Sequence, residues 1–377
     1  MKLIGFFLFL IMFTQSCVSQ NATNKHFEPG KIWKDTDGKH INAHGGGIYF
    51  EDGTYYWYGE HKDRSSIAQV GVRVYSSTDL FNWKNEGVAL AVSTDLDSEI
   101  TKGSVIERPK VVYNKKTGKY VMWFHLELKD QGYHAARTGV AISDLPTGPF
   151  HYLKSYRPNA GVWPLNFPLK NQETQKNDAS LEWWTPEWSA ALVEGLYVRR
   201  DFEEGQMSRD MTIFVDDDDK AYHIHSSEEN QTLHISELTD DYLDFTSRWV
   251  RMQPGGQNEA PAVFKQDDTY YMITSGLTGW APNPARSFSA KSIWGPWESL
   301  GNPAKGKRAE VTFNSQSTHV LPVEGKENTF LYMGDRWNPK NHIDGRYIWL
   351  PILIKDEKPQ IKWMDTWNFA DYNATQP

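Results

Sequence analysis

The clearest regularity along the chain is a turn signal followed by a strand rich in aromatic and apolar residues. Five copies of this pattern lie at 51–58, 116–123, 218–224, 267–273 and 327–333. A short apolar segment precedes each turn, at 47–50, 110–113, 211–215, 261–264 and 320–323. Two β-prone runs separated by Gly, Asp or Asn are typical of a β-hairpin. The pattern therefore predicts five hairpins, and its repetition indicates a repeat architecture.

A second recurrence follows the hairpins and predicts further strands. An apolar strand and then an aromatic residue after a turn occur at 74–83, 141–150, 235–245 and 288–297. No segment after the N-terminal region keeps a 3.6-residue period, so we expect few and short helices. Four strands repeated five times predict an all-β fold, a five-bladed β-propeller. A β-sandwich or a two-domain all-β protein is the alternative.

The copies are unevenly spaced, because the second and third lie further apart than the first and second. We therefore expect a long inter-blade insertion at about 155–205, a segment that contains Trp183, Trp184 and Trp188. Loops of this size on a propeller often shape a binding site, although a purely structural excursion is equally compatible with the sequence.

The composition narrows the choice of ligand. The chain has 377 residues, a formal net charge of -8, 16 Trp, 18 Tyr and 18 Phe. Such a charge gives no basic surface for a phosphate backbone, so we expect no nucleic-acid partner. Aromatic side chains can stack on the apolar faces of sugars, or they can fill a core. A small ligand of little charge, such as a carbohydrate, fits this composition.

The N-terminus has the features of an export signal. Lys2 precedes an apolar run from Leu3 to Phe13, which is too short for a membrane span and is typical of a secretory signal. Cys17 is the only cysteine, and its position resembles that of the lipidated residue of bacterial lipoproteins. We expect a signal at 1–17, a polar tether at 18–28 and a propeller domain at 29–377. The protein would be exported, and either periplasmic or anchored to the outer membrane through Cys17. Ordinary cleavage that discards Cys17 is the alternative to the lipid anchor.

Three acids and a glutamine share one position in the repeat. The first strand of each propeller blade lines the central axis. Glu107, Asp210, Glu259 and Gln316 lie at the start of that strand in four copies, whereas the first copy has Ala43 there. Crowded acids raise one another's pKa, and a protonated acid facing a carboxylate can hydrolyse a glycosidic bond. A calcium site, carboxylates that close the channel, or a sugar pocket without catalysis are the alternatives.

The motifs around these residues resemble glycoside hydrolase family 43, most closely its exo-β-1,3-galactanase subfamily. The matching segments are 43–47, 58–60, 107–110, 120–125, 208–210, 259–261, 279–284, 333–337 and 346–349. They span nearly all of the chain after the signal, in order. The resemblance implies a five-bladed hydrolase that inverts the anomeric centre and removes sugars from a chain end.

The resemblance also implies roles for the ring residues. Glu259 would be the general acid, and Asp210 would orient it and adjust its pKa. The aspartate base that most of the family carries on the first blade is missing at 42–45. In its place Glu107 and Gln316 would position the water. A neutral amide is a poor base, so Glu107 is the preferred base, with Gln316 holding the water.

Four further residues would contact the sugar by the same resemblance, namely Glu60, Tyr133, Thr278 and Trp280. Each has a structural alternative: Glu60 could pair with Lys62 or Arg73, and Trp280 could pack between blades. Arg108 and Arg336 could pair with the pocket acids and lower their pKa, or be ordinary members of buried ion pairs. His125, His223, His225 and His319 are expected to be structural, with a metal role open for His319. No cofactor is required, and a structural calcium ion is compatible with the sequence.

We therefore expect an exported, monomeric glycosidase that degrades a plant or algal polysaccharide or its oligosaccharides, with galactan 1,3-β-galactosidase as the leading activity. The long insertion could adapt the pocket to another sugar. β-Xylosidase, α-L-arabinofuranosidase and β-galactofuranosidase activities stay open on the same fold. A non-catalytic glycan-binding lipoprotein, or a propeller that binds a protein partner, would belong to another class.

Overall fold

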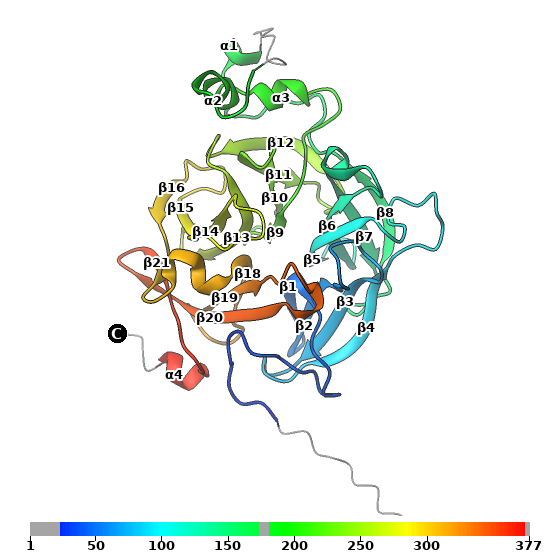
Figure 1. Cartoon of the computed structure of the whole chain (residues 1–377), viewed down its shortest axis with the longest axis vertical. Helices are drawn as coiled ribbons and strands as arrows, with labels where there is room; N and C mark the ends of the chain where they lie inside the picture. Colours follow the sequence, from blue (N-terminus) through cyan, green and yellow to red (C-terminus); the bar gives the residue numbers. More distant parts are fainter. Residues whose placement is uncertain (1–22, 173–180, 374–377) are drawn as a thin grey trace, which may run out of the picture.

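A computed structural model describes residues 23–172 and 181–373. Five β-sheets, antiparallel except for one short parallel pair, stand around a central axis like the blades of a propeller (Figure 1). This confirms the predicted five-bladed all-β fold. The predicted signal and the lipidated Cys17 lie outside the described residues. No helix in the described part is long and apolar enough to cross a membrane.

Each blade is a meander whose strands run in chain order between the axis and the rim. Blade one holds β1 (His44–Glu51), β2 (Thr54–Glu60), β3 (Gly71–Ser77) and β4 (Lys84–Ala91). Blade two holds β5 (Val105–Asn114), β6 (Lys119–Glu127), β7 (Arg137–Ser143) and β8 (His151–Tyr156). Blade three holds β9 (Met211–Val215), β10 (Ala221–Ser227), β11 (Thr232–Leu238) and β12 (Phe245–Met252).

The last two blades meet through a short extra strand. Blade four holds β13 (Asn258–Gln266), β14 (Thr269–Gly276), β15 (Arg286–Ala290) and β16 (Glu298–Gly301). Blade five holds β18 (Gln316–Pro322), β19 (Phe330–Arg336), β20 (Arg346–Lys355) and β21 (Lys358–Lys362). β17 (Ala304–Lys305) follows blade four in the chain but pairs in parallel with β21, so that blade five has five strands.

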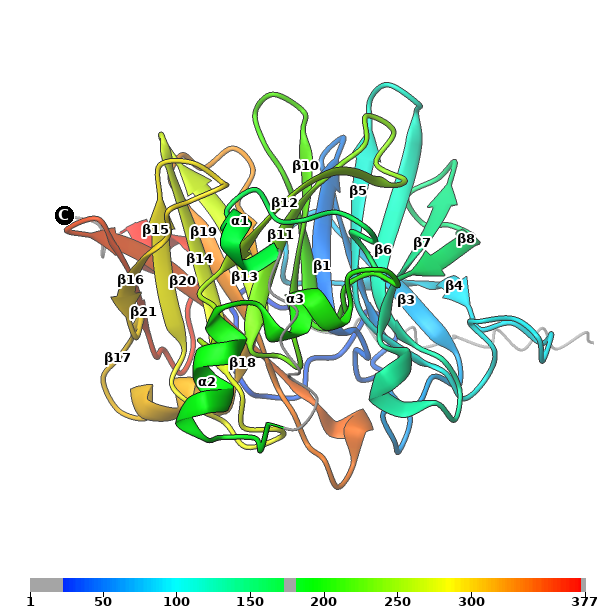
Figure 2. The same cartoon turned by 90° about the horizontal axis from the view of Figure 1, so that it is seen from above.

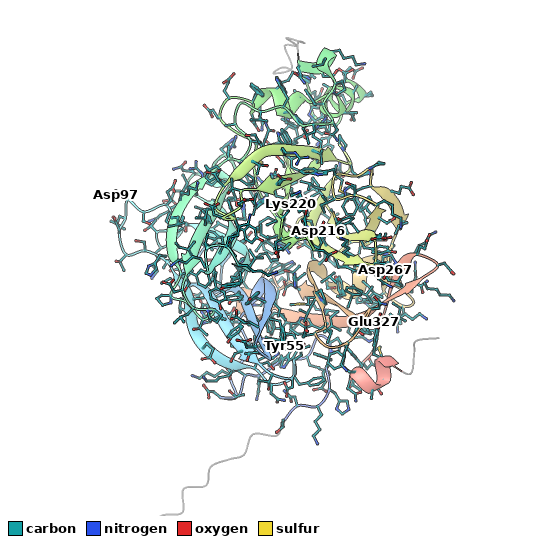
Figure 3. The ribbon with its side chains drawn as sticks, turned by 180° about the vertical axis from the view of Figure 1, so that it is seen from behind. Tyr55, Asp97, Asp216, Lys220, Asp267 and Glu327 are labelled. Atoms are coloured by element: carbon teal, nitrogen blue, oxygen red, sulfur yellow. The ribbon has the colours of Figure 1, made fainter. Side chains whose placement is uncertain are left out.

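The predicted turn signals close the hairpins between the first and second strands. Asp52, Asp219, Asp267 and Asn328 adopt positive φ angles of 47°, 60°, 52° and 50°. Asp and Asn tolerate this left-handed conformation better than most residues. These turns lie at one end of the axis, where Figure 3 labels Asp216, Lys220, Asp267 and Glu327. The opposite ends of the inner strands are therefore free to form a site.

Irregular pairing marks that opposite end in four blades. The register between the first and second strands shifts at 44–47, 107–110, 259–262 and 317–319. Arg108 and Ala260, inside two of these shifts, have φ angles of 56° and 53°. Such bulges bend a strand and re-aim its side chains. They turn the starts of the inner strands, which carry the predicted ring residues, toward the axis.

The segment between β8 and β9 forms short helices outside blade three (Figures 1 and 2). These are α1 (Leu169–Gln172), α2 (Pro186–Val193) and α3 (Leu196–Arg200). The Thr185 hydroxyl accepts the Trp188 N–H at 3.2 Å and caps α2, with Pro186 at its first turn. Arg251 of β12 donates to the carbonyls of Leu192 and Val193, both at 2.8 Å. The insertion is thereby fastened to blade three.

The two ends of the described chain meet between blades five and one. Phe27 and Trp367 form an antiparallel bridge, with N–O distances of 2.8 and 3.1 Å, and their rings stack at 4.4 Å. Because Phe27 is buried at 2% exposure, the tether predicted for 18–28 was wrong at its C-terminal end. The fold begins before residue 29. α4 (Phe369–Asn373) follows the bridge.

Candidate active site

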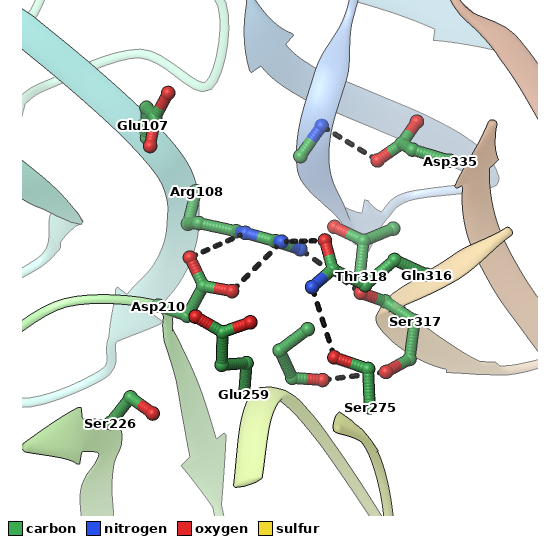
Figure 4. A network of polar contacts seen from close by, with 12 residues as sticks. Glu107, Arg108, Asp210, Ser226, Glu259, Ser275, Gln316, Ser317, Thr318 and Asp335 are labelled. Atoms are coloured by element: carbon green, nitrogen blue, oxygen red, sulfur yellow. Dashed lines mark hydrogen bonds and ion pairs between the residues drawn. The ribbon is translucent and has the colours of Figure 1, made fainter. Parts of the chain in front are cut away.

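The structure brings the four predicted ring residues together at one end of the axis (Figure 4). Glu107, Glu259 and Gln316 lie on β5, β13 and β18, and Asp210 directly precedes β9. Two of them, Asp210 and Gln316, contact the guanidinium of Arg108, and Glu259 lies beside Asp210. About a fifth of the Glu107 and Asp210 side-chain surface is exposed, 22% and 17%. The cluster is therefore within reach of solvent.

Arg108 holds the cluster together. Its Nε and Nη2 donate to the two carboxylate oxygens of Asp210 at 3.2 and 2.9 Å. Nη2 also donates to Gln316 Oε1 at 2.6 Å, and Nη1 donates to the Ser317 carbonyl at 3.0 Å. A two-pronged pair between Arg and a carboxylate fixes direction as well as charge. The expected pairing of Arg108 with a pocket acid is confirmed.

Gln316 is held by three partners. Its Oε1 accepts from Arg108 and, at 2.8 Å, from Trp337 Nε1, while its Nε2 donates to Ser275 Oγ at 2.9 Å. Arg and Trp side chains only donate, so this orientation of the amide is fixed by its neighbours. Both lone pairs of the amide oxygen are used, and one N–H is left. In this arrangement Gln316 can hold a water molecule but offers no lone pair for a proton.

Glu259 is set up as an acid. Its Oε1 accepts from Asn230 Nδ2 at 2.9 Å. Burial raises the pKa of Glu259, and the nearby Asp210 carboxylate raises it further, to about 8. A carboxyl group with this pKa is protonated at neutral pH and can donate its proton. Asn230 fixes one oxygen and leaves the other for a bound substrate.

Glu107 has the opposite electrostatic setting. Burial by itself would raise its pKa, but Lys62, His125 and Arg108 outweigh burial and lower the pKa to about 2. Lys62 Nζ donates to Glu107 Oε1 at 2.8 Å. Between about pH 2 and pH 8, Glu107 is therefore ionised while Glu259 is protonated. Two carboxyl groups whose pKa values are pushed apart are the usual arrangement of an acid and its partner base.

Glu60 lies behind this pair and is almost fully buried. Lys62 forms an ion pair with Glu60 as well as with Glu107, and the Arg108 N–H donates to Glu60 Oε1 at 3.0 Å. Burial is the main cause that raises the pKa of Glu60 to about 7. Gly45, at φ 62°, passes so close that a Cβ there would lie 2.1 Å from Glu60 Oε1. The structural alternative, pairing with Lys62, is what the structure shows.

The other predicted sugar contacts lie around the cluster. Trp280 is 46% exposed and meets Trp337 and His342 edge-on, at 5.8 and 5.0 Å between ring centroids. Thr278 donates to the Ala281 carbonyl at 2.6 Å and so shapes the Trp280 loop. Trp280 therefore borders an open cavity and does not pack between blades.

Trp280, Trp337, Gln316 and Ser275 line this cavity, whose volume is about 350 Å³. Tyr133 does not line this cavity. It lies in η1 (Gly132–Ala135), is 63% exposed, and has its ring centroid 3.3 Å from the Arg209 guanidinium carbon. Ligand cavities of small molecules usually start near this size. The cavity joins aromatic faces to the amide of Gln316, as a sugar-binding pocket does.

Comparisons with known proteins agree with this geometry. The model of glycosyl hydrolases family 43 matches residues 185–351. A solved GH43 β-1,3-galactosidase with galactodeoxynojirimycin is 55% identical, with a TM-score of 0.89 over 91% of this chain and 100% of that one. The chain belongs to glycoside hydrolase family 43. It is a glycoside hydrolase with the fold of that family.

Two further solved structures support the same assignment. Another GH43 β-1,3-galactosidase is 40% identical, with a TM-score of 0.78 over 93% of this chain and 65% of that one. An exo-β-1,3-galactanase from Phanerochaete chrysosporium, solved with β-1,3-galactotriose, is 34% identical, with a TM-score of 0.74 over 92% and 68%. None of the curated proteins matches the chain.

Several site residues of this family 43 enzyme were not predicted. Lys62, Asn230 and Ser275 contact ring residues but lie on second strands or in the loops after them, away from the repeat position. Trp337 and Asp335 belong to a motif that carried the family resemblance, yet no role followed from it. Asp335 is buried and accepts the Gly45 N–H at 2.8 Å, which ties blade five to blade one.

The remaining expectations concern Arg336 and the histidines. Arg336 donates to the carbonyls of Phe313 and Asn314 and forms no ion pair with a described residue, so both alternatives given for it, a pocket acid or another buried ion pair, were wrong. His125 and His223 are buried and hydrogen-bonded, to the Ser208 carbonyl and to Thr138. Burial and Lys110 lower the pKa of His319 to about 3. Residues 23–172 and 181–373 contain no group of three or more His, Cys, Asp or Glu arranged for a metal ion.

Proposed function

We propose that this family 43 enzyme removes galactose from the non-reducing end of β-1,3-linked galactan, with inversion at the anomeric carbon. The observation that carries the proposal is the pair of oppositely tuned acids, Glu259 and Glu107, on either side of Arg108 and Asp210. The substrate class is supported by the names of the similar structures, which are a β-1,3-galactosidase and an exo-β-1,3-galactanase.

Glu259 acts first, as the general acid. Asn230 holds its Oε1, so the proton on the other oxygen is directed to the glycosidic oxygen. As the C1–O bond breaks, its electron pair stays on the leaving oxygen, which takes the Glu259 proton. Asp210 keeps that proton on Glu259 until substrate binds, because its negative charge opposes ionisation of Glu259.

Glu107 and Gln316 act on the water. The free N–H of Gln316 orients the molecule, and the ionised Glu107 accepts its proton as the water oxygen bonds to C1 from the opposite face. Glu107 is a weak base because its pKa is low. It suffices because the carbon carries oxocarbenium-like charge and is strongly electrophilic.

Sugar contacts in this proposal come from Trp280 and Trp337, which line the cavity, from Thr278 in the Trp280 loop, and from the exposed Tyr133 ring next to Arg209. Aromatic faces bind the apolar side of a pyranose ring. Glu60 supports the site mainly through Lys62 and Arg108. Other family 43 activities, on β-xylosides, α-L-arabinofuranosides or β-galactofuranosides, are the outcomes against which the proposal is tested.

Export and lipid anchoring through Cys17 form a separate proposal, which rests on the sequence of the first 17 residues. Its test is metabolic labelling with palmitate followed by membrane fractionation. Label that is lost in Cys17→Ser supports the anchor, and an unlabelled, fully released protein contradicts it. Size-exclusion chromatography with light scattering tests the expected monomer.

The decisive experiment offers β-1,3-galactobiose together with aryl β-galactoside, β-xyloside, α-arabinofuranoside and β-galactofuranoside. We expect turnover of the β-1,3-galactoside and, by proton NMR, α-galactose as the first product. First release of β-galactose would contradict inversion. Glu259→Gln should abolish turnover of galactobiose and keep its binding, whereas a glycan-binding protein would show no turnover in either form.

A further inference from the structure

A second cavity, of about 640 Å³, lies between β17, β21 and the end of β19. Five cationic side chains line it: Lys305, Lys307, Arg308, Arg336 and Lys362. Asp365 is the single carboxylate among its lining residues. A cavity so rich in cations stands out on a chain whose net charge is -8. Such a local field favours an anionic ligand.

None of these five cations forms an ion pair with any residue that the structure describes. Arg308 donates to the Asn314 side chain, and Lys305 donates to the Asn302 carbonyl at 2.7 Å. Arg336 donates only to backbone carbonyls. Burial lowers the pKa of Arg336, and the charges of Arg308 and Arg346 lower it further. Within the cavity Arg308 and Arg336 therefore repel one another, and an anion bound between them would relieve that repulsion.

The cavity also has an aromatic wall. The Trp363 ring lies 5.8 Å from the Arg336 guanidinium and 5.7 Å from the Phe313 ring, and both residues line the same space. Trp363 Nε1 donates to Asp365 Oδ1 at 2.8 Å, which orients the indole, and Asp365 contributes one carboxylate against five cations. Aromatic faces next to cations suit a ligand that combines an apolar face with a negative charge. A sugar ring with an acidic group has this character.

Arg336 connects this cavity to the active site. It lines both the cationic cavity and the one that contains Gln316 and Trp337. Asn314 lines the active-site cavity, and its carbonyl and side chain accept from Arg336 and Arg308. The two cavities are thus neighbours that share one side-chain wall. A branched or extended glycan that binds in the active-site cavity could therefore place a second sugar unit in the cationic cavity.

We propose that the cationic cavity is a subsite for a sugar that carries an anionic substituent, on the same glycan whose terminal galactose enters the active site. This inference rests on the proposed function for the identity of the glycan, although binding in the cavity does not depend on catalysis. The anion is either the carboxylate of a uronic acid or a sulfate ester. Both are planar or tetrahedral oxyanions that Arg and Lys bind.

The test measures binding to the full chain by isothermal titration and saturation-transfer NMR. The probes are methyl β-glucuronide, galactose 6-sulfate, methyl β-galactoside and inorganic sulfate. The variant is Lys307→Gln with Lys362→Gln, since both side chains are exposed and the exchange removes charge with little change in size. Lys358→Gln is the matched control, because Lys358 is exposed on the same strand, β21, but does not line the cavity.

We expect an anionic sugar to bind the natural protein, to bind about tenfold more weakly to the double variant, and to bind Lys358→Gln unchanged. A higher salt concentration should weaken this binding, because the ion pairs between the anionic group and the cavity side chains would be partly exposed to solvent. Binding of the glucuronide alone identifies the carboxylate, and binding of the 6-sulfate alone identifies the sulfate. Equal affinity of the two anionic sugars for the natural protein and the double variant would overturn the proposal.

Two further outcomes separate this inference from the proposed function. If inorganic sulfate binds as tightly as either sugar, the cavity holds an anion only and the sugar subsite is wrong. If β-1,3-galactobiose is not hydrolysed but the anionic sugar still binds through Lys307 and Lys362, the subsite stands and the proposed function fails. If β-1,3-galactobiose is hydrolysed but no anionic sugar binds, the proposed function stands and the subsite is wrong.

Discussion

At the scale of single residues, the proposed mechanism depends on opposite charge states of two glutamates. In that mechanism Glu259 must be protonated, and burial together with the Asp210 carboxylate raises its pKa to about 8. Activity is therefore present below that pH and is lost as pH rises through it. Glu107, with a pKa lowered to about 2, stays ionised throughout. We expect kcat/KM for β-1,3-galactobiose to be level near neutral pH and to fall about tenfold per pH unit above pH 8.

An aryl galactoside is the control for this pH profile. Its leaving group needs less protonation, so the loss of rate above pH 8 should be smaller for the same enzyme. The measurement is kcat/KM for both substrates between pH 4 and pH 10. A galactobiose profile that keeps rising through pH 8 would show that Glu259 is not the acid.

Asn230 offers a second test at this scale, because it holds Glu259 by one hydrogen bond of 2.9 Å. Its φ of 62° suits glycine, so Asn230→Gly removes the amide without straining the backbone. We expect kcat to fall about tenfold, by loss of one hydrogen bond to a reacting group, and the alkaline limb of the pH profile to move upward.

Asn328→Gly is the matched control, since Asn328 has φ 50° in a hairpin turn at the other end of the axis. It should change neither kcat nor the pH profile. A loss of activity in Asn230→Gly with the alkaline limb in its original place would mean that Asn230 supports the fold and does not act on Glu259.

The site residues differ in how far the sequence reveals them. Glu107, Asp210, Glu259 and Gln316 occupy one position of a repeat, so counting back from each turn finds them. Asn230 enters from a different loop, and its contact with Glu259 spans 29 residues that no local pattern connects. Contacts between loops depend on how the blades pack, and a single sequence does not encode that packing in any periodic signal.

At the scale of elements, the insertion is held by a buried ion pair. Arg251 donates to both carboxylate oxygens of Glu228 at 2.7 Å, and Glu228 is fully buried. The same guanidinium binds the last carbonyls of α2. The substitution Arg251→Leu removes the cation from this pair, and the buried Glu228 carboxylate then keeps only its contact with His234. We expect a loss of about 3–5 kcal/mol in the free energy of unfolding, measured in urea.

Arg248→Leu is the control on the same strand, β12. Its partner Glu237 lies at 3.1 Å, and half of the Arg248 side chain is exposed. A surface pair of this kind contributes about 0–1 kcal/mol, so this variant should unfold close to the natural protein. If the two variants lose equal stability, the anchoring role of Arg251 is wrong.

Strand prediction succeeded where a turn residue and an aromatic run mark a hairpin, as in β1 and β2. It missed β17, which is two residues long and pairs in parallel with β21. Strand β20 was not predicted as a strand, although its residues 346–349 belong to a family motif, because no turn signal like those of the other blades precedes it. α2 escaped prediction because its buried Trp188, Ala191 and Leu192 give one short apolar face in only eight residues. Short elements are set by their tertiary neighbours more than by their own pattern.

At the scale of the whole molecule, a propeller is stable only if its first and last blades are held together. Here the closure is made by residues from both ends of the described chain. Phe27 stacks on Trp367, and Trp367 Nε1 donates to the Trp349 carbonyl at 2.9 Å. Trp349 lies 4.8 Å from Trp57 of blade one. One aromatic core therefore joins blades five and one.

Trp367→Ala tests this closure. Trp367 is fully buried, so the exchange removes a large side chain and leaves a cavity that the rigid blades cannot fill. We expect a loss of about 3–5 kcal/mol in the free energy of unfolding and a lower urea midpoint for the whole domain. Trp184→Ala, at an insertion residue that is 60% exposed, should cost far less.

Because the active site is built from inner strands of several blades, opening of the ring should abolish hydrolysis at the same urea concentration at which tryptophan fluorescence changes. Hydrolysis that outlasts the fluorescence change would show that the site does not depend on the closed ring.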